Sequence, residues 1–183
     1  NPDRYIYDAV KKGNDIPLPD EINAGIREVA LRTEWNKPAP ENFALPTEIW
    51  REVVDRRNRY NEVKGKIESG EVYNINDLIT YNLNIRQFAQ DVIEDAEDPD
   101  FIRHFYKAIN SVTILDPTCG SGAFLFAAMN ILEPLYEACI MRMRSFVEDE
   151  DRLNEAVQRS FSHKFKDFRL KLEEIQNEHH PNL

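Results

Sequence analysis

The feature that most constrains the fold of this chain is a change of hydrophobic period near residue 111. Before it, apolar residues recur every three or four positions, as in amphipathic helices. The run Ser111-Val112-Thr113-Ile114-Leu115 is then rich in β-branched residues and ends at Asp116-Pro117, a pattern typical of a buried strand. Small residues follow over 118–122, and the helical period returns at Ala123. The sequence predicts a helical region, one strand, a tight turn and a long helix.

Several helices are predicted before the turn, over 20–32, 47–70, 76–97 in two pieces, and 99–110. Asp20 and Thr47 are the expected N-caps, Gly70 is placed to end the long second helix, and Pro99 suits a first turn. Residues 35–46 are expected to be an extended, proline-stiffened connection. The predicted apolar face of the first helix consists of Ile22, Ile26, Val29 and Ala30.

After the turn, Pro134 is expected to kink or restart the long helix, because proline removes a backbone donor and crowds the preceding turn. The acidic run Glu148-Asp149-Glu150-Asp151 is interpreted as a solvated break between helices. One more helix is predicted over 161–176.

Charge bears on the possible partners. The formal net charge is −10, which argues against this segment alone gripping a phosphate backbone, since such binding depends on Lys and Arg. Residues 51–66 are a local exception, interpreted as the solvated face of a helix, with basic side chains at Arg51, Arg56, Arg57, Arg59, Lys64 and Lys66.

Other features bear on the cellular compartment. The two cysteines, Cys119 and Cys139, are too few for a disulfide scaffold and indicate a reducing cytosol. No apolar run approaches the ~20 residues of a membrane span, and no basic head followed by an apolar segment marks a secretory signal. Because the sequence begins at Asn1 without Met, we expect it to be cut from a longer protein.

The turn itself has the features of a ligand-binding junction. Gly120 and Gly122 let the backbone approach a ligand, and the following helix offers free N–H groups to an anion. Asp116 lies at the carboxyl end of the predicted strand, where open parallel sheets bind ligands. A phosphate-binding loop is excluded because no Lys-Ser or Lys-Thr follows the second glycine, and Leu125 replaces the third glycine of a dinucleotide fingerprint. Cys119 has no histidine near it in sequence and is interpreted as a small filler.

The turn resembles the first motif of the amino-group DNA methyltransferases, Asp-Pro-x-x-Gly-x-Gly-x-Phe, at every specified position: Asp116, Pro117, Gly120, Gly122 and Phe124. Residues 45–52, 75–82 and 130–137 also look like the large single-chain bacterial restriction–modification methylases, a group that includes type IIG and phage-defence adenine-specific enzymes. The resemblance implies that the cofactor is S-adenosylmethionine. Asp116 and the glycine turn would hold its methionine part and Phe124 would pack beside it. The full expected set is Asp116, Pro117, Thr118, Cys119, Gly120, Ser121, Gly122 and Phe124.

The resemblance also implies a fold class and partners. The chain is expected to be mainly α, with a helical connector over 1–110 leading into the first β-α unit of a truncated Rossmann-like (α/β) methyltransferase domain over 111–183. Its expected partners are double-stranded DNA, bound through the parent protein, and other domains of the same parent chain. It is expected to be cytoplasmic, with no membrane and no metal. Without neighbours, the strand should be exposed, irregular or paired with another copy.

Two elements of the family lack clear counterparts. Some methylases place a Thr-Pro segment before the first motif to close the cofactor pocket. The candidate here is Thr80-Tyr81-Asn82, which lacks the proline, and an ordinary helix cap at Asn82 explains it equally well. No Asn-Pro-Pro-aromatic sequence is present to hold a flipped adenine, so no catalytic residue is assigned and the segment should be inert by itself.

Two alternatives stay open. One is a helical connector that positions nuclease, methylase and specificity regions, for which the long 47–70 helix is typical. The other is a methyltransferase acting on RNA or protein, which shares the 116–124 pattern.

Overall fold

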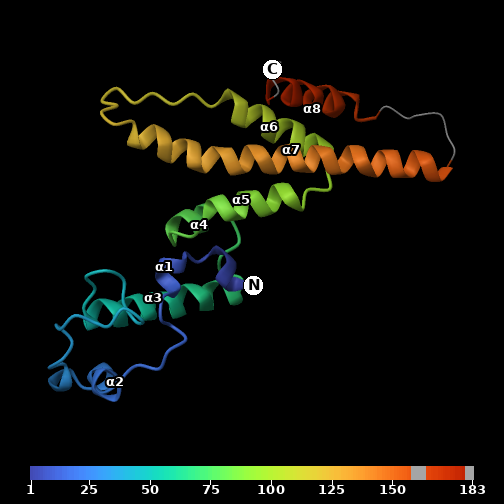
Figure 1. The fold of residues 1–183 in the computed structure, drawn as a ribbon. Helices are drawn as coiled ribbons and strands as arrows, with labels where there is room; N and C mark the ends of the chain where they lie inside the picture. The colour runs from blue at the N-terminus through green and yellow to red at the C-terminus, as the bar shows by residue number, and fades with distance from the viewer. Residues whose placement is uncertain (158–163, 180–183) are drawn as a thin grey trace. The chain divides into compact units, whose positions relative to one another are not determined.

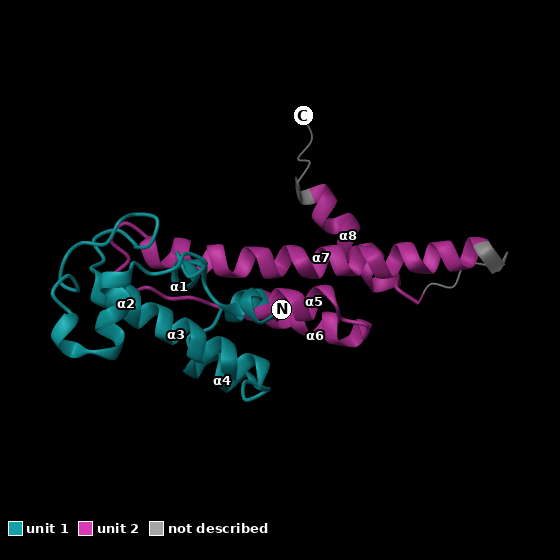
Figure 2. Cartoon of the chain, turned by 90° about the horizontal axis from the view of Figure 1, so that it is seen from below, with its two compact units in different colours: residues 1–87 teal, residues 88–183 magenta. Residues whose placement is uncertain are grey.

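The computed structural model of the protein describes residues 1–157 and 164–179 (Figure 1). This part of the chain is mainly helical and forms no strand, which confirms the predicted mainly α class at that level. The chain divides into two compact units, residues 1–87 and residues 88 onward (Figure 2). The functional boundary predicted at 110/111 lies inside the second unit.

The first unit collects short helices around one long helix. The contacts of α3 are with α1 and the 3-10 helix η1. The core of the unit combines three aromatic residues with aliphatic ones, namely Ile22, Trp35, Phe43, Ala44, Trp50, Val53 and Val54. In chain order its elements are η1 (Pro2–Tyr5), α1 (Asp8–Lys11), α2 (Asp20–Arg27), η2 (Val29–Leu31), α3 (Trp50–Glu68) and α4 (Ile75–Thr80).

Helix α2 is shorter than predicted because a tryptophan occupies the space beside it. The Trp35 indole donates to the carbonyl of Ile22 at 3.2 Å. Its Nε1 lies 2.4 Å from where a Cβ on Gly25 would stand, so glycine is required for this contact. The chain leaves the helix after Arg27. Ile22 is buried as expected, but Ile26 and Val29 are exposed, so the predicted apolar face is wrong beyond the first turn.

Helix α3 begins at Trp50, three residues after the predicted start. Thr47 is not its N-cap: it has a φ of +69°, which is strained for a β-branched residue. The Glu52 carboxylate accepts the N–H of Ile49 at 2.9 Å instead. The predicted end is confirmed, because Gly70 has a φ of +76° directly after the helix.

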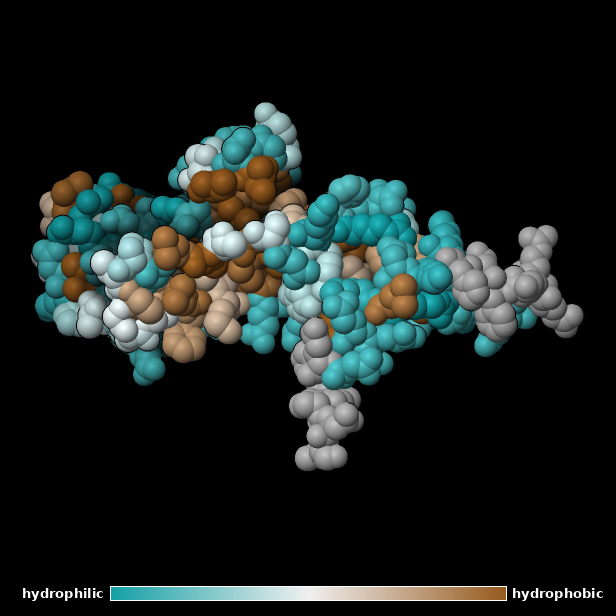
Figure 3. Space-filling model, turned by 90° about the horizontal axis from the view of Figure 1, so that it is seen from above, coloured by the Kyte–Doolittle hydropathy of each residue, from teal (hydrophilic) through white to brown (hydrophobic). Residues whose placement is uncertain are grey.

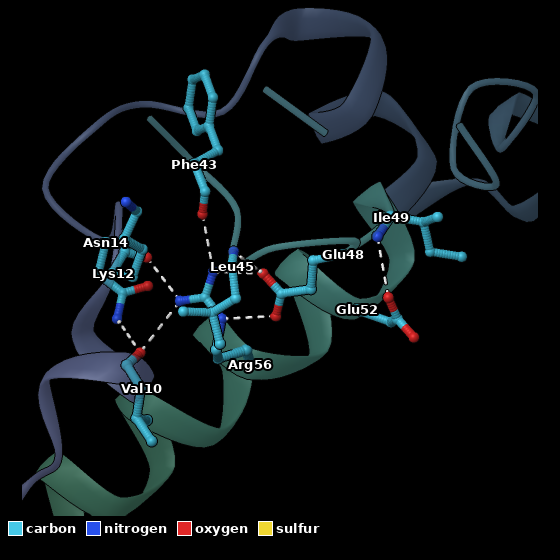
Figure 4. Close-up of polar contacts among 9 residues, drawn as sticks. All are labelled: Val10, Lys12, Asn14, Phe43, Leu45, Glu48, Ile49, Glu52 and Arg56. Carbon is cyan, nitrogen blue, oxygen red and sulfur yellow. Dashed lines mark hydrogen bonds and ion pairs between the residues drawn. The ribbon is translucent and has the colours of Figure 1, made fainter. Parts of the chain in front are cut away.

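Two arginines of α3 hold the N-terminal loops in place, and Figure 4 shows the contacts of one of them, Arg56. Arg56 pairs with Glu48 at 2.8 Å and donates to the carbonyls of Lys12 at 2.6 Å and Phe43 at 2.8 Å. Arg57 donates to the carbonyls of Gly13 and Ile16. The interpretation of the basic run as a solvated face is therefore wrong for these two side chains, which are part of the fold of the first unit.

The second unit is built on one long helix. Helix α5 (Ile85–Glu94) crosses the boundary between the units, and α6 (Pro99–Ser111) and α8 (Lys166–His179) pack on α7 (Ala123–Val157). Helix α6 matches its prediction, with Pro99 in the first turn and the Asp98 carboxylate accepting the N–H of Asp100 at 2.9 Å. The core consists of Ile93, Ile102, Tyr106, Leu135, Ala138, Cys139, Met143, Val147, Phe165 and Phe168.

Helix α7 continues through both predicted interruptions. Pro134 lies inside it. The acidic run is helical rather than a break, and Glu150 is buried, because its carboxylate accepts the N–H of Lys164 at 2.8 Å and pairs with Arg169 at 3.2 Å. Arg169 also pairs with Asp151 at 2.6 Å, which fastens α8 to α7. The predicted start of the last helix at Phe161 lies outside the described residues.

The predicted strand does not form. Residues 112–116 have no regular secondary structure and belong to no ladder. Val112, Ile114 and Leu115 are 50%, 48% and 88% exposed. The segment is exposed and irregular, which is one of the outcomes expected for a strand without neighbours.

Candidate cofactor-binding turn

Asp116 uses one carboxylate oxygen in a local turn and leaves the other without a hydrogen-bond partner in the described structure. Its Oδ1 accepts the N–H of Thr118 at 3.0 Å, which closes a local turn. Its Oδ2 is buried and has no hydrogen-bond partner in the described part of the chain. A buried carboxylate oxygen without a donor is costly. The unpaired Oδ2 of Asp116 is therefore a candidate acceptor for a hydrogen-bond donor of a ligand.

The two motif glycines adopt backbone conformations that other residues rarely take. Gly120 has a φ of +50° and Gly122 a φ of +76°. The Gly122 N–H donates to the carbonyl of Cys119 at 2.7 Å, which tightens the turn directly before α7. Successive turn conformations of this kind point backbone N–H groups into a concavity that binds anions. The glycines therefore have a conformational reason to be here, as the sequence predicted.

The first turn of α7, which begins seven residues after Asp116, has N–H groups without helical acceptors. The N–H of Phe126 makes the first helical bond, to the carbonyl of Gly122 at 3.0 Å. In the described structure, the N–H groups of Ala123, Phe124 and Leu125 have no such acceptor, as is usual at a helix N-terminus. These donors and the helix dipole favour a negative group. A carboxylate acceptor and an anion-binding helix end thus lie within one short segment.

Two aromatic side chains flank the turn in different ways. Phe124, the motif aromatic, is 80% exposed and is not buried in the turn. Phe126 lies against it: its ring is 3.6 Å, and the Cys119 sulfur 3.9 Å, from where a Cβ on Gly122 would stand. The sequence analysis missed Phe126. The available signal was its position one helical turn after Gly122, since residues four apart share a face.

The remaining motif residues are exposed, namely Pro117, Thr118, Cys119 and Ser121. The Thr80-Tyr81-Asn82 segment belongs to the first unit, where its side chains have structural partners. The Tyr81 hydroxyl donates to Glu71 at 3.1 Å and accepts from Lys66 at 3.3 Å. Asn82 has a φ of +50° after α4, as expected of a helix-ending residue. These contacts favour the cap interpretation over a cofactor lid.

The basic residues of α3 do not form a free cationic surface. Besides Arg56 and Arg57, Lys64 pairs with Asp3 at 3.6 Å and Lys66 with Glu71 at 2.6 Å. The hydrogen bonds that Lys66 donates to Glu71 and to Tyr81 raise its pKa above the ordinary value, in that order of effect. Three of the six basic side chains of this run are therefore paired with carboxylates of the same unit.

Helix α7 is long and apolar enough, by length and composition, to cross a membrane, which the sequence analysis did not anticipate. Core helices of soluble proteins pass the same test, but they are mostly buried, whereas 17% of the apolar window of α7 is buried. Residues from Leu135 onward already contribute to the core of the second unit. The exposed apolar stretch before them, 123–132, would span about 15 Å at 1.5 Å per residue, half of a hydrocarbon core of roughly 30 Å.

No family model, curated protein or solved structure matches this chain. Among the described residues, no group of three or more His, Cys, Asp and Glu side chains is arranged to hold a metal ion.

Proposed function

We propose that this chain carries the first S-adenosylmethionine-binding element of a DNA adenine-N6 methyltransferase of the restriction–modification or phage-defence kind. The observation that carries the proposal is the turn over 116–124. There the motif residues combine an unpaired carboxylate oxygen, two left-handed glycines and a free helix N-terminus. The Rossmann-like domain that such a motif implies is part of this proposal.

The chemistry of the turn suits the methionine end of the cofactor, which carries both an ammonium and a carboxylate. Asp116 would accept a hydrogen bond from the ammonium through Oδ2. The N–H groups that begin α7 would donate to the carboxylate. Phe124, exposed at the edge of the turn, would pack beside the bound cofactor. Bound cofactor would supply the methyl group, and the residues of this chain would only hold and orient it.

Methyl transfer needs residues that this sequence does not include. The amino group of adenine is a weak nucleophile, and the related enzymes bind it through an Asn-Pro-Pro-aromatic loop, which is absent from the 183 residues. The proposed role of the chain is therefore cofactor binding within a larger enzyme, with double-stranded DNA bound mainly by other parts of that enzyme.

One alternative keeps support from the structure. Helices α3 and α7 are long, and α7 runs for 35 residues, as in a connector that sets the distance between domains. A connector needs no free carboxylate oxygen beside two left-handed glycines, so the turn favours the cofactor site. A methyltransferase acting on RNA or protein would use the same turn, and the alternatives differ in their substrate.

The test is a titration of the ¹⁵N-labelled chain with S-adenosylmethionine, followed by amide NMR. We expect weak binding, with a dissociation constant of about 1 mM or higher, because one short turn supplies few contacts. Shifts should be confined to 116–125. Asp116→Ala should weaken binding about ten- to a hundred-fold, since a charge-assisted hydrogen bond contributes roughly 1.5–3 kcal/mol.

The matched control is Asp149→Ala, which removes an exposed carboxylate far along α7 from the turn. It should leave the shifts unchanged. Shifts that persist in Asp116→Ala, or that spread over both units, would reject the assignment. Tight binding, near micromolar or below, would show that the site is more complete than we propose.

A further inference from the structure

A groove between two helices of the second unit carries negative charge that the fold leaves uncompensated. Helix α5 lies beside α7 in both ribbon views (Figures 1 and 2), and the groove between them has a volume of about 370 Å³. We call it the α5–α7 groove. It is open to solvent, and none of its lining residues belongs to the turn over 116–124. Six residues line it: Gln90 and Glu94 from α5, and Pro134, Glu137, Ala138 and Met141 from α7.

The apolar part of the groove is one face of α7. Pro134, Ala138 and Met141 are spaced by four and three residues and therefore share this face. The Met141 side chain is 59% exposed, and methionine is flexible enough to adapt to a binding partner. Apolar groups are exposed at other places on the molecule as well, as the brown areas of Figure 3 show, so apolar character alone does not distinguish this groove.

The distinguishing feature is a pair of carboxylates, one on each helix. Glu94 of α5 and Glu137 of α7 both line the groove and are exposed. In the described part of the chain neither pairs with a cation: Glu94 accepts the side-chain amide of Gln90 at 2.9 Å, and the carboxylate of Glu137 has no protein partner. Glu94 is also the last residue of α5, and the C-terminal end of a helix dipole favours a positive group.

The chain around the groove adds to this negative field. Residues 87–102 contain six acidic residues and no basic one. Residues 88–183 contain 18 Asp and Glu against 10 Lys and Arg, so the second unit carries most of the net charge of −10. Two arginines that approach this acidic stretch have other partners: Arg142 donates to the carbonyl of Ala96 at 2.7 Å, and Arg103 pairs with Asp100 and with Asp167, each at 2.6 Å. The groove is therefore complementary to a ligand with positive charge.

We infer that the α5–α7 groove binds an arginine side chain presented by a segment of another protein. The planar guanidinium has five donors, enough to reach carboxylates on both helices at once, and its methylene stem suits the apolar face between them. A metal ion fits less well, because among the described residues no group of three or more His, Cys, Asp and Glu side chains is arranged to hold one. The negative charge argues against a phosphate backbone as the occupant. This inference is independent of the proposed function, since it requires no cofactor.

The test is amide NMR of the ¹⁵N-labelled chain, titrated with a capped five-residue peptide that has arginine at its centre and alanine elsewhere. We expect saturable shifts at residues 90–94 and 134–141, with a dissociation constant of roughly 1 mM, because one side chain supplies few contacts. The same peptide with citrulline, a neutral side chain of the same shape, should bind about tenfold more weakly or worse. Glu94→Gln and Glu137→Gln should each weaken binding about threefold, and the double variant about tenfold.

The matched control is Glu173→Gln, which removes an exposed carboxylate on α8, outside the groove, and should bind the peptide like wild type. Circular dichroism of each variant verifies that the helices are intact. The absence of shifts up to about 20 mM peptide overturns the inference, as does equal binding of the citrulline peptide. Wild-type binding by the double variant, or equal weakening by Glu173→Gln, would overturn the groove as the site. Spermine that shifts the same residues at a lower concentration than the peptide would identify a polyamine as the occupant instead.

Discussion

Arg56 provides a direct test of how the first unit is held together. It bonds to the carbonyls of Val10 and Lys12 at the end of α1 and of Phe43 in the loop before α3, and it pairs with the Glu48 carboxylate. Replacing Arg56 with Ala removes every one of these donors at once. The Glu48 carboxylate then keeps its negative charge but loses its partner, although its side chain is only 13% exposed in the intact protein. We therefore expect Arg56→Ala to destabilise the first unit strongly.

The size of the effect follows from burial. Removing one partner of a buried ion pair costs about 3–5 kcal/mol, because the other charge is left without compensation. Water can reach a partly exposed Glu48, so we expect the low end, about 3 kcal/mol. A unit of 87 residues has a total stability of roughly 4–13 kcal/mol at the usual value per residue. The loss is therefore a large share of the total. Arg56→Lys keeps the charge but loses the planar fork, so its cost should be intermediate.

The assay is urea unfolding followed by tryptophan fluorescence. The chain has two tryptophans, and both Trp35 and Trp50 are in the core of the first unit, so their emission reports this unit. The matched control is Arg51→Ala on the same helix. Arg51 is exposed and makes a hydrogen bond to Asn36 at 2.6 Å, so its loss should cost about 0.5 kcal/mol or less. A loss below about 1 kcal/mol for Arg56→Ala would refute the assignment of a structural role.

The same pair predicts a dependence on pH. Burial raises the pKa of Glu48, but hydrogen bonds from Arg56 and from the Leu45 N–H outweigh it, so the pKa lies below the ordinary value of 4.5. A carboxyl with a depressed folded-state pKa adds stability above its unfolded pKa and loses it as the pH falls through the folded one. The difference between wild type and Arg56→Ala should therefore shrink below about pH 4. A constant difference down to pH 3 would contradict this.

Two further predictions concern the thiols and the glycines. Burial raises the pKa of the Cys139 thiol to about 11, whereas Cys119 is exposed, so a disulfide reagent at pH 8 should modify Cys119 quickly and Cys139 only on unfolding; rapid modification of both would contradict the described core. Gly65 lies inside α3 with nothing within 4 Å of an added Cβ, so Gly65→Ala should stabilise the first unit by about 0.5–1 kcal/mol in the urea assay. Gly122 has a positive φ, so Gly122→Ala should cost about 1–2 kcal/mol locally and speed amide exchange at Phe126; the same sign for both glycine variants would contradict the geometry.

Much of the candidate site could be read from the sequence. The left-handed glycines at 120 and 122 follow from residue type, since glycine alone takes this backbone conformation without strain. The start of α7 directly after them follows from the return of the helical period. The contact of Phe126 with Gly122 depends on the side-chain direction in the first helical turn, which the motif does not specify. That S-adenosylmethionine binds this turn stays a prediction.

Local signals predicted helices well where the ends are capped by near neighbours. Asp98 and Pro99 begin α6, and Gly70 follows the end of α3, because these effects act within one turn of the backbone. Local signals failed where a distant partner decides. Thr47 is not the cap of α3, and Glu48, directly after it, is turned toward Arg56 and the Leu45 N–H. Composition did not indicate this pairing, because the basic run suits a solvated helix face equally well.

The acidic run 148–151 is a second case in which a distant partner, and not the local sequence, decides the structure. Its composition suggests a solvated break, yet Glu150 is buried within α7, because Lys164 and Arg169 come from the segment that folds back onto it. The sequence by itself determined the helical period, the start of α6, the glycine that follows α3, and the glycine turn, all of which depend on residues a few positions apart. The tertiary structure alone decided which charges are buried and whether residues 112–115 become a strand. Both outcomes require a partner brought from elsewhere: a counter-charge in the first case, and a neighbouring strand in the second.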